Sequence, residues 1–219
     1  MIRAPQAPSV MLITDPRYPL ARMLDAVDAV GRALGPGRLV VQLRDKAAAA
    51  PSLEASARSL RAATERVGAM LVINVADQEA LRIAIGAGAD GVHVPCRDDV
   101  IRQVRARIGP SAWVSVPVHA DEEVTRAITA GATAVLASPI FETPGKGPPR
   151  GVGALVSART IAGKSLAIYA LGGVSPATAA ACAKAEADGV AVIRALLDAS
   201  DPAVVAKALD APFQAVSGG

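Results

Sequence analysis

The segment LAIYALGGVSPATAAACAKAEADGVAVI, residues 166–193, has an apolar run at each end and a stretch of helical spacing between them. The runs LAIYAL (166–171) and DGVAVI (188–193) are short and aliphatic, which favours buried strands. Between them, Ser175 is expected to cap a helix whose first residue is Pro176. The segment therefore predicts a strand–helix–strand unit with parallel strands and a right-handed crossover.

The same alternation recurs along the rest of the chain, with six earlier apolar runs: SVMLIT (9–14), RLVVQLR (38–44), AMLVIN (69–74), DGVHV (90–94), AWVSVPV (112–118) and TAVLAS (133–138). Eight strand–helix units in 219 residues close most economically into a single-domain (β/α)8 barrel. An open doubly wound sheet is the alternative. We expect an N-terminal extension over residues 1–8, the barrel over 9–210 and a C-terminal tail over 211–219.

The composition excludes several classes of protein. Hydrophobic residues make up 52% of the chain and aromatic residues 2%, so the core must be aliphatic. The net charge of +3 is small and its basic residues are scattered, which argues against a nucleic-acid partner. The chain has only two cysteines, and residues 1–8 lack the apolar segment of a signal peptide, so we expect a cytoplasmic protein. No apolar run is long enough to span a membrane, so we expect no membrane partner. A homo-oligomer stays open.

Polar residues follow most of the predicted strands. In such barrels the binding and catalytic groups come from the carboxyl ends of the strands. Gln42, Arg44 and Lys46 alternate along one run and its end, so they should point to the same side. The other candidates after strand ends are Asn74, His119, Thr143 and Lys146. His93 lies within an apolar run and is expected to be packed.

Two further strand ends predict a phosphate site. Gly172 and Gly173 close one run, and glycines let backbone N–H groups approach an anion closely. Ile193 and Arg194 end the last run, where barrels of this class often bind phosphate. We therefore expect a phosphate group between these two loops.

Taken together and in order, several motifs resemble the thiamine-phosphate synthase/TenI superfamily: LITD (12–15), VQLRDK (41–46), VIN (72–74), GADGVHV (88–94), VHADEEV (118–124), SPIFETPGK (138–146), ALGGVSP (170–176) and EADGVAVI (186–193). The resemblance implies a barrel that binds a small phosphorylated thiazole, with Thr143 and Lys146 near phosphate groups. Synthases of this superfamily join the thiazole phosphate to hydroxymethylpyrimidine diphosphate with Mg²⁺. TenI-like members tautomerise a carboxythiazole phosphate.

The departures from the synthase pattern concern its metal. Synthases have Asn-Asp after the third strand, and that Asp is a magnesium ligand, whereas this chain has Asn74-Val75. Asp77 could replace the missing ligand, and Asp98 matches the second one within an altered HVPCRD motif. We therefore expect no cofactor, and Mg²⁺ bound by Asp98 only if the chain is a synthase.

Some of the other features favour the tautomerase, and one favours the synthase. The loop Thr143-Pro-Gly-Lys146 is one hydroxyl short of the synthase pattern, and Arg194 replaces a usual Ser. QLRDK, in contrast, is synthase-like. The sequence favours a thiazole tautomerase, an isomerase in which His119 moves the proton, because an imidazole takes and gives protons near neutral pH. The alternatives are a Mg²⁺-dependent thiamine-phosphate synthase, which is a transferase, and a non-catalytic regulator that binds the thiazole phosphate.

Overall fold

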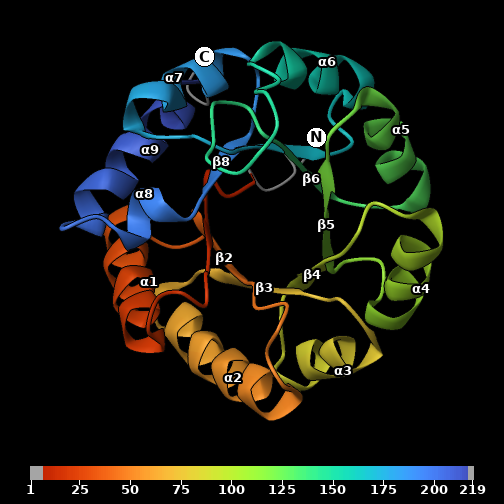
Figure 1. Cartoon of the computed structure of the whole chain (residues 1–219), viewed down its shortest axis with the longest axis vertical. Helices are drawn as coiled ribbons and strands as arrows, with labels where there is room; N and C mark the ends of the chain where they lie inside the picture. The colour runs from red at the N-terminus through yellow and green to blue at the C-terminus, as the bar shows by residue number, and fades with distance from the viewer. Residues whose placement is uncertain (1–6, 217–219) are drawn as a thin grey trace.

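The computed structural model describes residues 7–216, and these form a closed barrel of parallel strands (Figure 1). Each strand pairs with the next one along the chain, and β1 pairs with β8 to close the ring. This confirms the (β/α)8 fold and excludes an open sheet. Each strand lies inside one of the predicted runs: β1 Val10–Ile13, β2 Leu39–Leu43, β3 Met70–Asn74, β4 Gly91–His93, β5 Trp113–Val118, β6 Ala134–Ala137, β7 Ala167–Leu171 and β8 Gly189–Val192.

The helices surround this ring, and two of them follow β8 (Figure 1). No helix among residues 7–216 is long and apolar enough to cross a membrane. The expected tail from residue 211 begins inside the last helix, while residues 1–6 of the expected extension and residues 217–219 lie outside the described residues. The helices are α1 Leu20–Leu34, α2 Ala50–Val67, α3 Gln78–Gly86, α4 Asp98–Ile108, α5 Asp121–Ala130, α6 Gly153–Ala162, α7 Pro176–Lys184, α8 Arg194–Leu197 and α9 Pro202–Val216.

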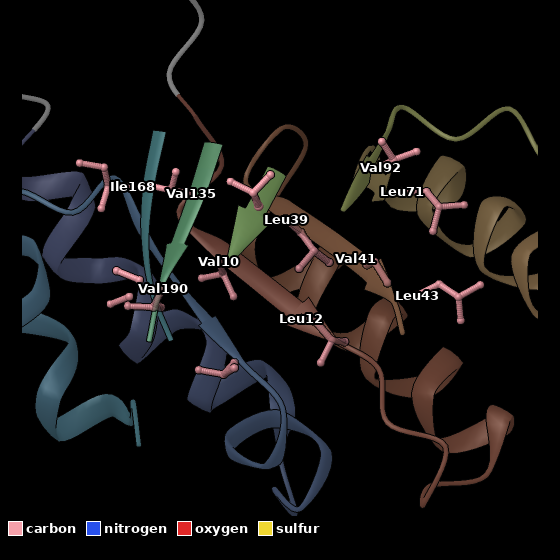
Figure 2. Close-up of a cluster of buried hydrophobic side chains, with 14 of the residues drawn as sticks. Val10, Leu12, Leu39, Val41, Leu43, Leu71, Val92, Val135, Ile168 and Val190 are labelled. Atoms are coloured by element: carbon pink, nitrogen blue, oxygen red, sulfur yellow. The ribbon is translucent and has the colours of Figure 1, made fainter. Parts of the chain in front are cut away.

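The strands separate two apolar layers. Val10 and Leu12 of β1 belong to the larger cluster, between the strands and the helices, part of which Figure 2 shows. Met11 and Ile13 belong to the smaller cluster inside the barrel, because successive side chains of a strand point to opposite faces. The remaining buried members of the interior cluster are Val40, Val72, Ala134, Leu136, Tyr169 and Ala191.

Two strands begin with a glycine because the neighbouring strand comes very close. A Cβ atom at Gly91 would lie 2.1 Å from the carbonyl oxygen of Trp113, and one at Gly189 would lie 2.5 Å from that of Ser9. A larger residue at either position would push neighbouring strands apart. The repeated Ala-Asp-Gly in the sequence thus marks the start of β4 and of β8.

The aspartate before each of these glycines belongs to a brace at the amino-terminal end of the barrel. Asp90 accepts hydrogen bonds from the Arg61 guanidinium at 2.8 Å and from the Leu71 N–H at 2.7 Å. It thereby connects α2, β3 and the start of β4. The same arrangement recurs half a barrel later, in Arg159, Asp188 and the Ile168 N–H. We call these two groups the Arg61 brace and the Arg159 brace.

Candidate active site

The carboxyl ends of the strands form one rim of the barrel, which we call the mouth. Next to β1, the Thr14 hydroxyl accepts a hydrogen bond from the Arg44 N–H at 2.9 Å and so joins the ends of β1 and β2. Asp15 forms an ion pair with Arg17 at 2.7 Å. Hydrogen bonds from Arg17 hold the pKa of Asp15 below its usual value. This carboxylate is therefore ionised and already neutralised within the protein.

Three polar residues lie near the carboxyl ends of β2, β3 and β4, at the base of the mouth. Gln42 is 1% exposed, and its Oε1 has no hydrogen-bond partner among the described residues. It is two residues beyond Val40 of the interior cluster, so its side chain is on the inward face of β2. Asn74 and His93 are paired in register on β3 and β4. We call Gln42, Asn74 and His93 the polar floor.

His93 is buried, as expected from its place in an apolar run. Its Nδ1 lies 3.0 Å from the Ser115 hydroxyl. Burial, with smaller effects of Lys46 and Arg44, lowers the pKa of His93 to about 4. His93 is therefore neutral near pH 7, and two basic side chains lie close enough to the floor to affect its charge.

His119 lies exposed at the end of β5. Its Nδ1 is 2.8 Å from the carbonyl oxygen of Ser138, which can only accept, so Nδ1 carries the proton. Glu123 accepts a hydrogen bond from the backbone N–H of His119 and another from Ala120. These contacts fix the ring, and its Nε2 is left as a hydrogen-bond acceptor in the neutral form.

The loop between β6 and α6 lies against the end of β7. The Ile140 and Phe141 N–H groups donate to the carbonyls of Leu171 and Gly172 at 2.9 and 3.0 Å. A Cβ atom at Gly173 would lie 2.5 Å from the Glu142 carbonyl oxygen, and this residue has a φ of +65°. The glycine pair is thus required to seat the loop, whatever ligand it contacts.

Thr143 and Lys146 occupy the outer part of the same loop. The Thr143 hydroxyl donates to the Phe141 carbonyl at 3.0 Å, and Lys146 is exposed. The loop lines a hollow of about 680 Å³ between residues 142 and 149.

The predicted phosphate loops offer free backbone donors. Among the described residues, no hydrogen bond uses the N–H of Gly173 or Arg194. The structure also bears out the expected helix start, because α7 begins at Pro176 directly after Ser175. The ends of β7 and β8 are adjacent, since Leu171 pairs with Ala191. Free N–H groups on two adjacent strand ends form a suitable anion site.

The carboxylates expected to hold a metal have other roles. Asp77 accepts a hydrogen bond from the Ala80 N–H at 2.8 Å and caps α3. Val75 is buried in the larger apolar cluster. Asp98 is half exposed and pairs with Arg126 at 3.5 Å. One expected ligand position is the apolar Val75, and the two nearby carboxylates are held by a helix cap and an ion pair, so this donor set fits a magnesium site poorly.

Basic side chains, in contrast, gather at the mouth without acidic partners. In the part of the chain that the structure describes, no ion pair engages Arg44, Lys46, Lys146 or Arg194. Arg150 is different, because it pairs with Asp121 at 3.3 Å. The mouth is therefore prepared for an anionic ligand.

Sequence reasoning did not single out two serines that position the histidines. Ser115 contacts the His93 ring, and the Ser138 carbonyl holds the His119 ring. Ser115 lies at an inward position of β5, two residues from Trp113, and that alternation was a usable signal. The bond from His119 to Ser138 joins two strand ends, and no local pattern predicts it.

Three comparisons with known proteins point to the same family. Residues 10–196 match the thiamine monophosphate synthase family. A thiamine-phosphate synthase of Roseiflexus sp. (strain RS-1) is 39% identical over 92% of this chain and 84% of the relative. One of Thiobacillus denitrificans is 35% identical over 89% of each chain. The solved structure of a thiamine phosphate pyrophosphorylase from Pyrococcus furiosus has a TM-score of 0.80 at 25% identity, covering 96% and 97% of the two chains.

These findings correct the expected activity. The prediction of a thiazole tautomerase, an isomerase, is wrong, because relatives that are 35–39% identical over most of this chain are named thiamine-phosphate synthases. The prediction gave too much importance to local departures such as Val75 and Arg194, and too little to the preserved QLRDK segment. The eight-stranded fold, the ordered motifs and these relatives together make the chain a member of the thiamine monophosphate synthase family.

Proposed function

We propose that this protein is a thiamine-phosphate synthase, a transferase that joins a thiazole phosphate to hydroxymethylpyrimidine diphosphate. The observation that carries the proposal is the set of unpaired basic side chains on two sides of the mouth. Arg44 and Lys46 follow β2, whereas Lys146 and Arg194 follow β6 and β8. Two phosphorylated substrates require two such groups of donors.

In this reaction the bond between the pyrimidine methylene carbon and the diphosphate oxygen breaks, and the thiazole nitrogen forms a new bond to that carbon. The diphosphate leaves with the bonding electron pair. We assign Arg44 and Lys46 to the leaving diphosphate, because fixed positive groups stabilise charge that develops in a transition state. Thr143 and Lys146 close over the phosphate groups from the β6–α6 loop.

The backbone N–H groups of Gly173 and Arg194, with the neighbouring Gly172 and Ile193, are proposed to bind the thiazole phosphate. Gln42 and Asn74 of the polar floor are proposed to hydrogen-bond the heteroaromatic rings, since a buried unpaired oxygen such as Gln42 Oε1 is costly without a ligand. His119 is proposed to contact a ring through Nε2. The transfer itself moves no proton between the substrates, so a proton shuttle is not required.

The test is a coupling assay with the purified protein and both substrates, in which thiamine phosphate and diphosphate are quantified. Product should form only when both substrates are present. Absence of product in buffers with Mg²⁺, with Mn²⁺ and with EDTA would overturn the proposal. A cytoplasmic location and a homo-oligomer stay predictions.

A further inference from the structure

We infer that this chain neutralises its diphosphate group with its own basic side chains and does not require a divalent cation. The inference rests on the proposed function, because it concerns the diphosphate of the same site. It is carried by an imbalance at the mouth, where most acidic side chains are held by contacts within the fold, whereas Arg44, Lys46, Lys146 and Arg194 form no ion pair with a described residue.

The acidic residues that follow β3 and β4 already have other partners. The Asp77 carboxylate holds the first turn of α3 through the Ala80 N–H. Turning it toward a metal would leave that N–H without its cap and would destabilise the start of α3. Val75 packs in the apolar layer and has no donor atom. Asp98 would have to leave Arg126 to bind a cation.

Three carboxylates on the other sides of the mouth are engaged as well. Asp15 is held by Arg17, and Asp121 accepts hydrogen bonds from Arg150 and Ser157. Glu123 accepts hydrogen bonds from two backbone N–H groups at the start of α5. Glu142 lies exposed on the β6–α6 loop, away from the β3–β4 side. A hard cation therefore has no prepared pair of oxygen ligands on the β3–β4 side.

The basic side chains of the mouth follow the ends of β2, β6 and β8. Arg44 and Lys46 follow the carboxyl end of β2, which pairs with β3 of the polar floor. Burial is the main cause of the low pKa of His93, and the charges of Lys46 and Arg44 lower that pKa further. Neither forms an ion pair with a described residue. Lys146 and Arg194 add positive charge on the β6–β8 side. These groups supply at the diphosphate the positive charge that a metal supplies elsewhere.

The first measurement compares initial rates in EDTA and in Mg²⁺ for enzyme freed of metal. We expect no loss of rate in EDTA. The second measurement is the calorimetric affinity for inorganic diphosphate, which should bind in EDTA and bind no more tightly with Mg²⁺ present. A rate that appears only with Mg²⁺, or diphosphate binding that depends on Mg²⁺, would overturn the inference.

Matched variants assign the effect to the mouth. Lys46→Met should weaken diphosphate binding in EDTA and reduce turnover by roughly 10²–10³-fold. Lys164→Met removes the same charge from an exposed position just before β7, at the opposite end of the barrel, and should change neither. If no product forms under any condition, the proposed function fails, and diphosphate binding in EDTA still decides the inference. Equal binding by both variants would contradict it.

Discussion

The two ends of the barrel use arginine in opposite ways. At the amino-terminal end, Arg61 and Arg159 each bind an aspartate that also accepts a hydrogen bond from a strand N–H. Arg38 likewise pairs with the buried Asp210 of α9. At the mouth, Arg44 and Arg194 form no ion pair with a described residue. The difference separates charges that hold the fold from charges kept available for a ligand.

The unpaired groups at the mouth are expected to lower the free energy of unfolding. Like charges gathered without partners repel each other, and a buried oxygen without a hydrogen bond is destabilising. The amino-terminal braces contribute stability that offsets these costs. Substitutions at the two ends should therefore fall into two classes, one that changes activity and one that changes stability.

The largest effect is expected at the mouth. Arg44→Gln removes a positive charge from the proposed diphosphate site, so kcat/KM should fall by roughly 10²–10³-fold. The melting temperature should not fall, because the guanidinium makes no ion pair with a described residue. Steady-state kinetics and a thermal melt of the same sample test both points. A large drop in melting temperature would show that Arg44 also stabilises the fold.

A second effect concerns the polar floor. The pKa of His93 is near 4 in the folded protein, below the ordinary 6.5, so the unfolded chain binds more protons between these two values. Its contribution to stability is complete above pH about 6.5 and is lost as the pH falls toward 4, by about 3 kcal/mol. Urea unfolding across this range measures it. The variant His93→Gln should have a flatter pH dependence, and an unchanged slope would contradict the assignment.

A third effect tests the opposite end. Arg159→Gln removes the guanidinium that binds Asp188 and the Glu186 carbonyl, so the free energy of unfolding should fall by about 2 kcal/mol. The rate of thiamine phosphate formation at a temperature well below the melt should stay unchanged. Urea unfolding and the coupling assay measure the two quantities. An equally large loss of rate would show that this end is not separate from function.

The smallest effect provides the reference. Arg58 and Glu54 form an exposed pair one helical turn apart on α2, at 2.8 Å. Arg58→Ala should change the free energy of unfolding by less than about 0.5 kcal/mol and leave kinetics unaltered. A larger loss in the same urea titration would mean that pairing alone, without the bond to a strand N–H, stabilises this barrel.

Much of the fold could be predicted from the sequence because the strands are mostly buried. A strand such as VMLI or AVLA has no polar residue, and turn or helix signals bound it on both sides. The repeated Gly after Asp also marked where strands start. Helix ends were harder, since α9 continues through Pro212 beyond the predicted end of the barrel.

The location of the candidate residues at the strand ends could be predicted, whereas their interactions could not. Parallel strands bring their carboxyl ends to one rim, so Gln42, Asn74 and His119 could be placed from the pattern alone. The pattern did not predict which charged side chains lack a partner. Asp77 caps a helix and Asp15 pairs with Arg17, and neither contact was expected from the sequence. These local partners decide whether a carboxylate is available to a ligand.

The two braces also bear on how the chain folds. Each joins an arginine to an aspartate 29 positions later in the chain. Ring closure is different, because contacts such as that between Tyr18 and Asp198 span 180 residues. Short loops close with less entropy loss than long ones, so each braced half can form early, and the β1–β8 seam is expected to form last. Weakening that seam should mainly speed unfolding, whereas weakening a brace should slow folding.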